Sequence, residues 1–164
     1  MNEQTRRNSL RLHGYDYSRE GPYFITICTK NSETMFGKIA NGKMTLSEYG
    51  HIAATELLKS ADIWNITVET YIIMPNHIHF IAKLERAAGT PPIQPSVTAD
   101  RSKQRLPAMI CRYKGAVTKS IGFSLWQRSY HDNIIHDAAG YKTIKHYIEC
   151  NPTTWERDRF YCTE

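Results

Sequence analysis

The sequence predicts an α+β fold in which helices cover one face of an antiparallel sheet. Three observations support this fold class. Stretches with an apolar period of two indicate strands, and two of these strands are joined directly by a tight Pro75-Asn76 turn. An Asn41-Gly42 pair lies between two further short stretches, as in a β-hairpin. Three longer segments instead repeat their apolar residues at helical spacing.

The N-terminal third of the chain supplies the first strands. Residues 23–29 alternate aromatic and β-branched side chains, which favours a strand. Residues 36–39 and 44–46 flank the Asn41-Gly42 pair. Both central positions of a type I′ turn require a positive φ, which Asn and Gly adopt readily. We therefore expect one strand followed by a hairpin.

A helix and two more strands follow the hairpin. Ser47 is the expected N-cap of a helix that runs to about residue 60, because its hydroxyl can accept a hydrogen bond from the first turn. Residues 65–73 and 77–84 are the expected strands on either side of the Pro-Asn turn. Residues 85–105 contain a glycine and three prolines and predict a flexible loop.

The last third of the chain predicts two helices with a strand between them. Residues 106–121 carry an apolar stripe at helical spacing, and Pro107 is tolerable in the first turn. Residues 124–135 alternate and predict a strand. Residues 138–150 predict the last helix, which we expect to end at Asn151 because a residue before proline avoids the α region.

Length and composition indicate one soluble, basic domain. The chain has 164 residues, which suits a single domain over 1–164. Lys and Arg number 21 against 16 Asp and Glu, which favours a polyanionic partner, nucleic acid first. No apolar run approaches the roughly 20 residues of a membrane span, so no membrane partner is expected. The scattered cysteines and the lack of a signal peptide indicate a reduced, cytoplasmic protein with Cys28 and Cys111 in its core.

Basic and aromatic side chains gather in three places that could contact nucleic acid. They are the basic lead-in at 1–20, the end of the 85–105 loop and the outer face of the 106–121 helix. A disordered tail, a solvated linker and an ordinary charged helix face are the alternatives. The candidate nucleic-acid-binding residues are Arg6, Arg7, Arg11, Tyr15, Tyr17, Arg101, Lys103, Arg105, Arg112, Lys114 and Lys119.

The strand expected at 77–84 begins with two histidines, His77 and His79. Alternate side chains of a strand point to the same face, so the two imidazoles share one face and Ile78 occupies the other. Two imidazoles so placed on a rigid strand can converge on one metal ion. The alternative is one histidine on the rim and one hydrogen-bonded in the core.

The helix expected at 138–150 presents a second group of candidates. Ile144, Tyr147, Ile148 and Asn151 form an i, i+3, i+4, i+7 row that should face the sheet. A buried phenol and a buried amide both need polar partners. If the row faces the strand of the two histidines, three possible ligands and one nucleophile converge. The alternative is an ordinary core aromatic and a helix-end residue.

Six short segments, spread over nearly the whole chain, occur in the same order in one known family. They are Gly14-Tyr15-Asp16-Tyr17, Phe24-Ile25-Thr26-Ile27-Cys28-Thr29, Met74-Pro75-Asn76-His77-Ile78-His79, Lys114-Gly115-Ala116-Val117-Thr118-Lys119, Leu125-Trp126-Gln127-Arg128-Ser129-Tyr130, and Tyr147-Ile148 with Asn151-Pro152. The chain thereby resembles the HUH (His-hydrophobic-His) single-tyrosine transposases, specifically the REP-associated tyrosine transposases.

The resemblance implies a ferredoxin-like fold with the two histidines on a central strand. It implies that Tyr147 is the nucleophile and that His77, His79 and Asn151 bind a metal. Mg²⁺ or Mn²⁺ would suit that role, because a phenol is a poor nucleophile toward an anionic phosphodiester. The implied partner is single-stranded or hairpin DNA of the palindromic-repeat type, cut and rejoined through a 5′-phosphotyrosine intermediate by a monomer or homodimer.

The chain departs from the family's pattern at 131–136, where His-Asp-Asn-Ile-Ile-His replaces the usual Tyr-Glu-His-Ile-Ile-Arg. This change affects auxiliary substrate contacts, not the four core positions. Tyr130 is a second candidate tyrosine, ranked lower because Ile134 follows it where a ligand would be needed. Two other interpretations are a non-catalytic DNA-binding protein derived from such a transposase, and an unrelated zinc protein that uses the histidines with a cysteine.

Overall fold

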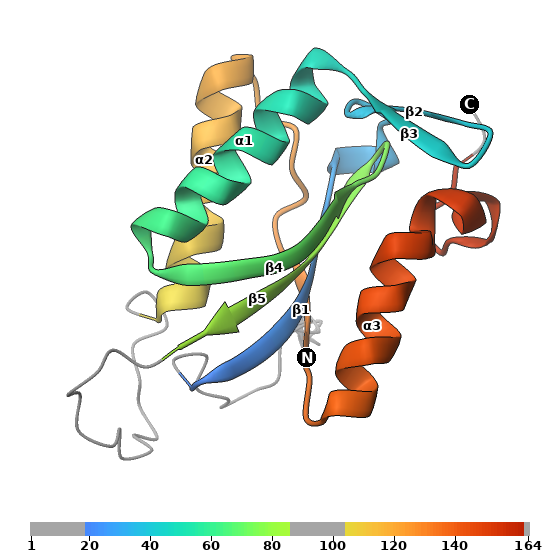
Figure 1. Cartoon of the computed structure of the whole chain (residues 1–164). Helices are drawn as coiled ribbons and strands as arrows, with labels where there is room; N and C mark the ends of the chain where they lie inside the picture. The colour runs from blue at the N-terminus through green and yellow to red at the C-terminus, as the bar shows by residue number, and fades with distance from the viewer. Residues whose placement is uncertain (1–18, 86–103, 163–164) are drawn as a thin grey trace, which may run out of the picture.

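Four antiparallel strands form the central sheet, in the order β4-β5-β1-β6. The computed structural model describes residues 19–85 and 104–162. Helices α1 and α2 connect β1 to β4 and β5 to β6 (Figure 1), which gives the β-α-β-β-α-β order of the ferredoxin-like fold. The bounds are β1 Gly21–Cys28, α1 Glu48–Ile63, β4 Ile66–Ile73, β5 His77–Leu84, α2 Arg105–Ile121 and β6 His131–Ile134. The predicted fold class is confirmed.

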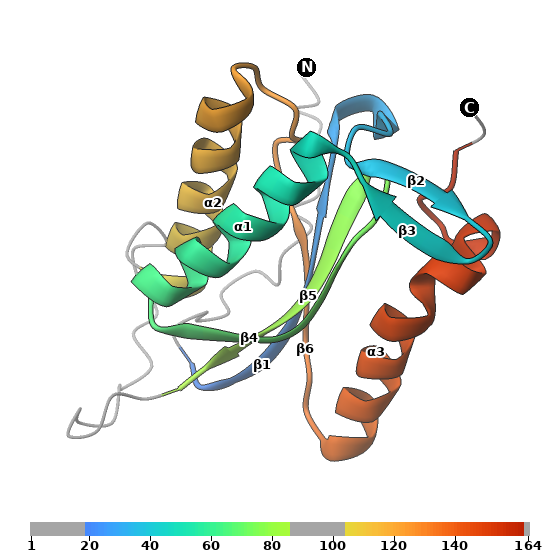
Figure 2. The ribbon, with the colours of Figure 1, turned by 45° about the horizontal axis from the view of Figure 1, so that its top comes forward.

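Helices cover both faces of this sheet. Helices α1 and α2 lie together on one face, and α3, Ala138–Cys150, lies on the other (Figures 1 and 2). The prediction that helices cover one face was therefore incomplete. The reason is that the second face also carries an apolar strip, in which Ile81 of β5 packs with Ile135 and with Ile148 of α3.

The strands and helices of the main core follow the predicted alternation. On β5, Ile78 and Phe80 face α1 and α2, where they pack with Leu57, Met109 and Tyr113 in one buried cluster. The alternate residues of β5 point toward α3. The strand therefore separates an apolar layer from the layer that holds the two histidines.

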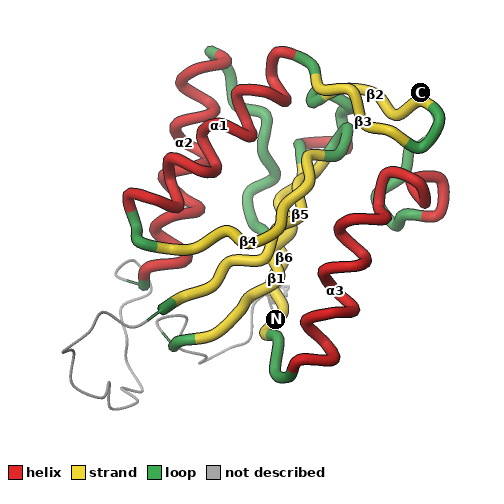
Figure 3. Tube along the Cα trace, in the orientation of Figure 1, coloured by secondary structure: helices red, strands yellow, loops and turns green. Residues whose placement is uncertain are grey.

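A two-stranded hairpin lies outside the main sheet, next to the end of α3 (Figure 3). It consists of β2, Gly37–Ala40, and β3, Lys43–Leu46. Asn41 and Gly42 have φ values of 53° and 69°, as the predicted turn requires. The Ser47 hydroxyl accepts a hydrogen bond from the Gly50 amide at 3.2 Å, which confirms the predicted N-cap of α1.

The strand predicted at 124–135 is wrong over most of its length. His131–Ile134 pairs with β1 as a strand, whereas Trp126 forms only an isolated bridge with Thr29, and Figure 3 draws most of the preceding stretch as a loop. The reason is that α2 holds this stretch: Lys114 Nζ donates hydrogen bonds to the carbonyls of Gln127 and Ser129 at 2.8 and 2.7 Å.

Helix α3 ends at Cys150 as predicted, but the predicted reason is wrong. Asn151 has φ −55° and ψ −40°, inside the α region despite the proline that follows. The chain continues as a 3₁₀ segment, η3, over Asn151–Arg157, because Pro152 begins this tighter turn and tolerates its first position. Of the two cysteines expected in the core, Cys28 is buried but Cys111 on α2 is exposed.

Some predictions fall outside the described residues. The lead-in at 1–20 and the loop at 85–105 lie almost wholly there, and the single-domain bounds 1–164 stay a prediction. Within the described residues, none of the helices has the length and apolarity to span a bilayer.

Candidate active site around the two histidines

Both histidines of the His-hydrophobic-His triplet lie on the central strand β5 with their side chains on the α3 side of the sheet. His77 is 0% exposed and His79 is 1% exposed, and their ring centroids are 4.4 Å apart. Neither histidine therefore lies on the rim. Two buried imidazoles in contact are arranged as metal-binding pairs are.

Hydrogen bonds to the Nδ1 atoms orient both imidazoles. His77 Nδ1 lies 2.9 Å from Asn76 Oδ1, an atom that can only accept, so Nδ1 is the donor. The Asn76 amide group in turn donates to the Phe160 carbonyl at 2.8 Å, which fixes its orientation. Thr26 Oγ1 lies 2.8 Å from His79 Nδ1. His77 thus has Nδ1 engaged and Nε2 without a partner, the usual arrangement of a metal-binding histidine, whereas His79 has Nδ1 engaged and its Nε2 facing Tyr147.

Tyr147 of α3 reaches the histidine pair. Its Oη lies 3.3 Å from His79 Nε2, and it donates a hydrogen bond to Asp158 Oδ2 at 2.9 Å. The phenol ring and the ring of Phe24 pack edge to face, with centroids 6.1 Å apart. Because the side chain is still 38% exposed, the hydroxyl lies beside a buried imidazole without being sealed from solvent.

Asn151 lies one turn after Tyr147 and is fully buried. Its Nδ2 donates to Asp158 Oδ2 at 2.7 Å. Asn151 Oδ1 and His77 Nε2 are two of the buried side-chain atoms that have no hydrogen-bond partner among the described residues. Buried polar atoms without partners are costly, and both atom types are good ligands of divalent cations. The donor set therefore fits a bound metal ion.

Asp158 is the site residue that sequence reasoning missed. Single ligand atoms of His77, His79 and Asp158 all lie within 4.8 Å of one another. Its other oxygen, Oδ1, accepts a hydrogen bond from the Phe160 amide at 2.7 Å. Asp158 follows η3 in a stretch without helical or strand periodicity, so only the tertiary path of the tail brings it to the histidines.

Burial sets the protonation of the site. It lowers the pKa of His77 to about 4 and, together with the neighbouring His77, lowers the pKa of His79 well below its usual value. Both imidazoles are therefore neutral at pH 7, the form that binds metals. Burial, and then the hydrogen bond to Asp158, raises the pKa of Tyr147 to about 12, so the phenol keeps its proton.

The cysteine alternative finds no support at this site. Among the described residues, the cluster suited to a metal joins the histidines with Asp158 and contains no cysteine. Burial raises the pKa of the nearby Cys28 thiol to about 11, so this thiol is protonated at neutral pH in the metal-free protein. Tyr130, the second candidate tyrosine, is 3% exposed and packs in the main core on the other side of the sheet.

The predicted nucleic-acid contacts are dispersed. Arg105 donates hydrogen bonds to the carbonyls of Trp64 and Glu85, both at 2.9 Å. Lys114 donates a hydrogen bond to a carbonyl of the loop before β6. Arg112 and Lys119 are exposed on α2, on the sheet face opposite α3. The others lie outside the described residues: Arg6, Arg7, Arg11, Tyr15, Tyr17, Arg101 and Lys103. Contact of these residues with nucleic acid stays a prediction.

Comparison with known proteins places the fold and the histidine pair in one family. The family model described as "Transposase IS200 like" matches residues 22–151, from β1 through Asn151. An uncharacterized protein of Haemophilus influenzae is 36% identical over 168 residues, which cover 94% of this chain and 93% of the relative. A solved REP-associated tyrosine transposase bound to a REP hairpin has the same fold, with a TM-score of 0.63 and 17% identity over 88% of this chain and 72% of that chain. The chain therefore belongs to the IS200-like transposase family.

Proposed function

We propose that this protein is a DNA strand transferase that cleaves and rejoins single-stranded or hairpin DNA with Tyr147 as its nucleophile. The observation that carries the proposal is the position of Tyr147 Oη, 3.3 Å from His79 Nε2 of the same chain and hydrogen-bonded to Asp158. Membership of a transposase family supports a nuclease or transferase role. The similar transposase that is bound to a REP hairpin, and a formal net charge of +5, support DNA as the partner.

The metal in this proposal is held by His77, His79 and Asn151. The unpartnered Asn151 Oδ1 supports its place as third ligand, because Asp158 holds the amide nitrogen and leaves the oxygen available. Two imidazoles and an amide oxygen would accept Mg²⁺ and suit Mn²⁺ better. When bound, a divalent cation withdraws charge from the phosphate oxygens and orients the phosphate for in-line attack.

The residues of this chain supply the nucleophile and take up its proton. Tyr147 Oη attacks the scissile phosphorus; the Oη–P bond forms and the P–O3′ bond breaks. The phenolic proton passes to Asp158, whose carboxylate already accepts that hydrogen bond at 2.9 Å. The released 3′ oxygen takes a proton from water, which leaves a 3′-hydroxyl and a 5′-phosphotyrosine link. A 3′-hydroxyl can attack that link in reverse and rejoin strands without ATP.

A gel assay tests the proposal. End-labelled hairpin DNA, incubated with the protein and Mn²⁺, should yield a covalent adduct that survives denaturation. Tyr147→Phe should yield none. Tyr141→Phe is the matched control, because Tyr141 is also on α3 but binds Glu69 with its hydroxyl, and its adduct should match wild type.

Two outcomes would overturn the proposal. An equal adduct from Tyr147→Phe would remove Tyr147 from the reaction. Hairpin binding without any adduct from the wild-type protein would favour a non-catalytic DNA-binding protein.

A further inference from the structure

A third histidine, His131, lies on the same face of the sheet as the histidine pair. Residues directly opposite each other in two antiparallel strands point to the same face. Thr26 of β1 is opposite His79 of β5 on one side and opposite His131 of β6 on the other. Because the Thr26 hydroxyl reaches His79 Nδ1, this is the face toward α3. The three side chains therefore form one row across three neighbouring strands.

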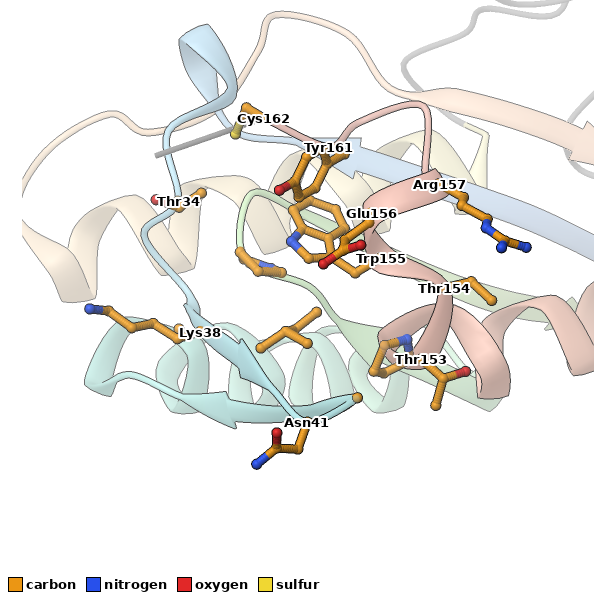
Figure 4. Close-up of a pocket in the computed structure, with 15 residues that line it drawn as sticks. Thr34, Lys38, Asn41, Thr153, Thr154, Trp155, Glu156, Arg157, Tyr161 and Cys162 are labelled. Atoms are coloured by element: carbon orange, nitrogen blue, oxygen red, sulfur yellow. The ribbon is translucent and has the colours of Figure 1, made fainter.

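The ring of Phe160, in the tail, covers all three histidines. Its centroid lies 4.7, 5.9 and 6.1 Å from those of His77, His79 and His131. Two contacts hold this ring in place. The Asn76 amide group donates a hydrogen bond to the Phe160 carbonyl at 2.8 Å. Trp155 and Tyr161, which lie before and after Phe160 in the chain, pack edge to face with centroids 5.3 Å apart (Figure 4). His131 therefore borders the same site as the pair.

His131 differs from the pair in its exposure and in its contacts. Its side chain is partly exposed, whereas His77 and His79 are buried. Within residues 19–85 and 104–162, neither ring nitrogen of His131 has a hydrogen-bond partner. A neutral imidazole can accept a proton at one nitrogen and donate one at the other. An imidazole between solvent and a reaction site can therefore transfer protons between them.

Strand cleavage needs a proton at the 3′ oxygen, because an unprotonated alkoxide is a poor leaving group. In an in-line displacement, the leaving oxygen lies on the side of phosphorus opposite the attacking oxygen. Tyr147 comes from α3, which packs on β4 and β5, whereas His131 is on β6 at the other edge of the sheet. With neighbouring strands about 4.8 Å apart, β6 lies about 10 Å from β5. A phosphate at the histidine pair thus has His131 on the side away from α3.

The groups that face His131 set its protonation. They are Arg159 of the tail, Asp132 beside it on β6, and His79 across Thr26. Burial, and then the charge of Arg159, lowers the pKa of His131 below its usual value, although Asp132 opposes this shift. The neutral ring is therefore the main form at pH 7, and this form accepts a proton from a 3′-hydroxyl during rejoining.

We propose that His131 transfers a proton between solvent and the 3′ oxygen of the DNA. In cleavage, protonated His131 gives its proton to the 3′ oxygen as the P–O3′ bond breaks, and then takes another from water. In rejoining, neutral His131 takes the proton of the attacking 3′-hydroxyl as the P–O3′ bond forms and the Oη–P bond breaks. The inference rests on the proposed function. It assigns the proton of the 3′ oxygen to His131 and that of Tyr147 to Asp158.

The test replaces the bridging 3′ oxygen of the scissile phosphate with sulfur. A thiol has a pKa of about 8.5, far below that of an alcohol, so the sulfur leaves as a thiolate without a proton donor. On ordinary hairpin DNA with Mn²⁺, His131→Gln should slow adduct formation about a hundredfold. On the sulfur-bridged hairpin, His131→Gln should react as fast as wild type. His51→Gln, at an exposed position of α1, is the control and should match wild type on both substrates.

The two substrates separate this inference from a structural role and from the proposed function. His131→Gln that is equally slow on both substrates, or that loses Mn²⁺ affinity, would give His131 a structural or metal-binding role and overturn the inference. A wild-type rate of His131→Gln on ordinary DNA would also overturn it. Tyr147→Phe should form no adduct with either substrate. An adduct from that variant would contradict the proposed function, whatever His131→Gln does.

Discussion

The two halves of the candidate site are built in different ways. The histidine half is on the central strand β5, fully buried, with each Nδ1 hydrogen-bonded to a neighbouring residue. The other half, Tyr147, Asn151 and Asp158, comes from the end of α3 and the tail, where Tyr147 is partly exposed. A rigid strand fixes the two histidines, whereas Asn151, the proposed third ligand, lies with the proposed nucleophile and proton acceptor on a segment that depends on tail packing.

Loss of a ligand from the rigid half should have the largest effect. His77→Ala should lower adduct formation about a thousandfold or more, beyond the 10–100-fold expected for a residue that only hydrogen-bonds to a ligand, because the variant removes a proposed ligand atom itself. The measurements are the initial rate of adduct formation and the Mn²⁺ dissociation constant. His51→Ala, on the exposed face of α1, is the control and should match wild type. Unchanged Mn²⁺ affinity in His77→Ala would remove His77 from the metal site.

The half of the site on α3 and the tail is tested by Asp158→Asn, which keeps the shape of the side chain and removes the proposed proton acceptor. The rate of adduct formation should fall about a hundredfold while Mn²⁺ affinity stays near wild type. Titration calorimetry with Mn²⁺ and single-turnover kinetics separate these two effects. If Mn²⁺ affinity falls in proportion to the rate, Asp158 binds the metal as the histidines do. The proposal that Asp158 acts as the proton acceptor and not as a metal ligand would then be wrong.

The hydrogen bonds behind the histidines should matter less than the ligands themselves. Thr26→Val removes the hydroxyl 2.8 Å from His79 Nδ1 and should weaken Mn²⁺ binding about tenfold. Thr67→Val, at an exposed position of β4, is the matched control. Wild-type affinity in Thr26→Val would mean that strand geometry alone orients His79.

Acid should destabilise the histidine half. The folded-state pKa of His77 is about 4, below its usual 6.5, so the unfolded chain binds this proton more readily than the folded chain between those values. The contribution of His77 to the free energy of unfolding is therefore complete above pH 7. It decreases as the pH falls, by about 2 kcal/mol between pH 7 and pH 5. Urea unfolding at the two pH values, on metal-free protein, measures it. A His77→Phe variant with the same loss over this interval would contradict this origin.

The sequence predicted the half of the site that depends on local chemistry. The period of two in β5 is enough to put His77 and His79 on one face and Ile78 on the other, and the Asn41-Gly42 turn needs only its own backbone preferences. The helical row through Tyr147 and Asn151 could also be predicted from the sequence, because i, i+3, i+4 spacing identifies a helix face.

The remaining errors arise from contacts between distant segments. Asp158 reaches the histidines through the path of the tail, which no local period encodes. Residues 124–130 alternate like a strand, yet the lysine of α2 binds their carbonyls instead. Asn151 stays helical before a proline because η3 continues the chain as a tighter turn. Each error marks a place where tertiary contacts override a local preference.

The most direct test of Tyr147 as the nucleophile identifies the residue joined to DNA. Wild-type protein, reacted with hairpin DNA and Mn²⁺ and digested with protease and nuclease, can be mapped by tandem mass spectrometry. We expect the nucleotide-bearing peptide to carry its modification on Tyr147. Modification of Tyr130 or of any other tyrosine in its place would contradict it.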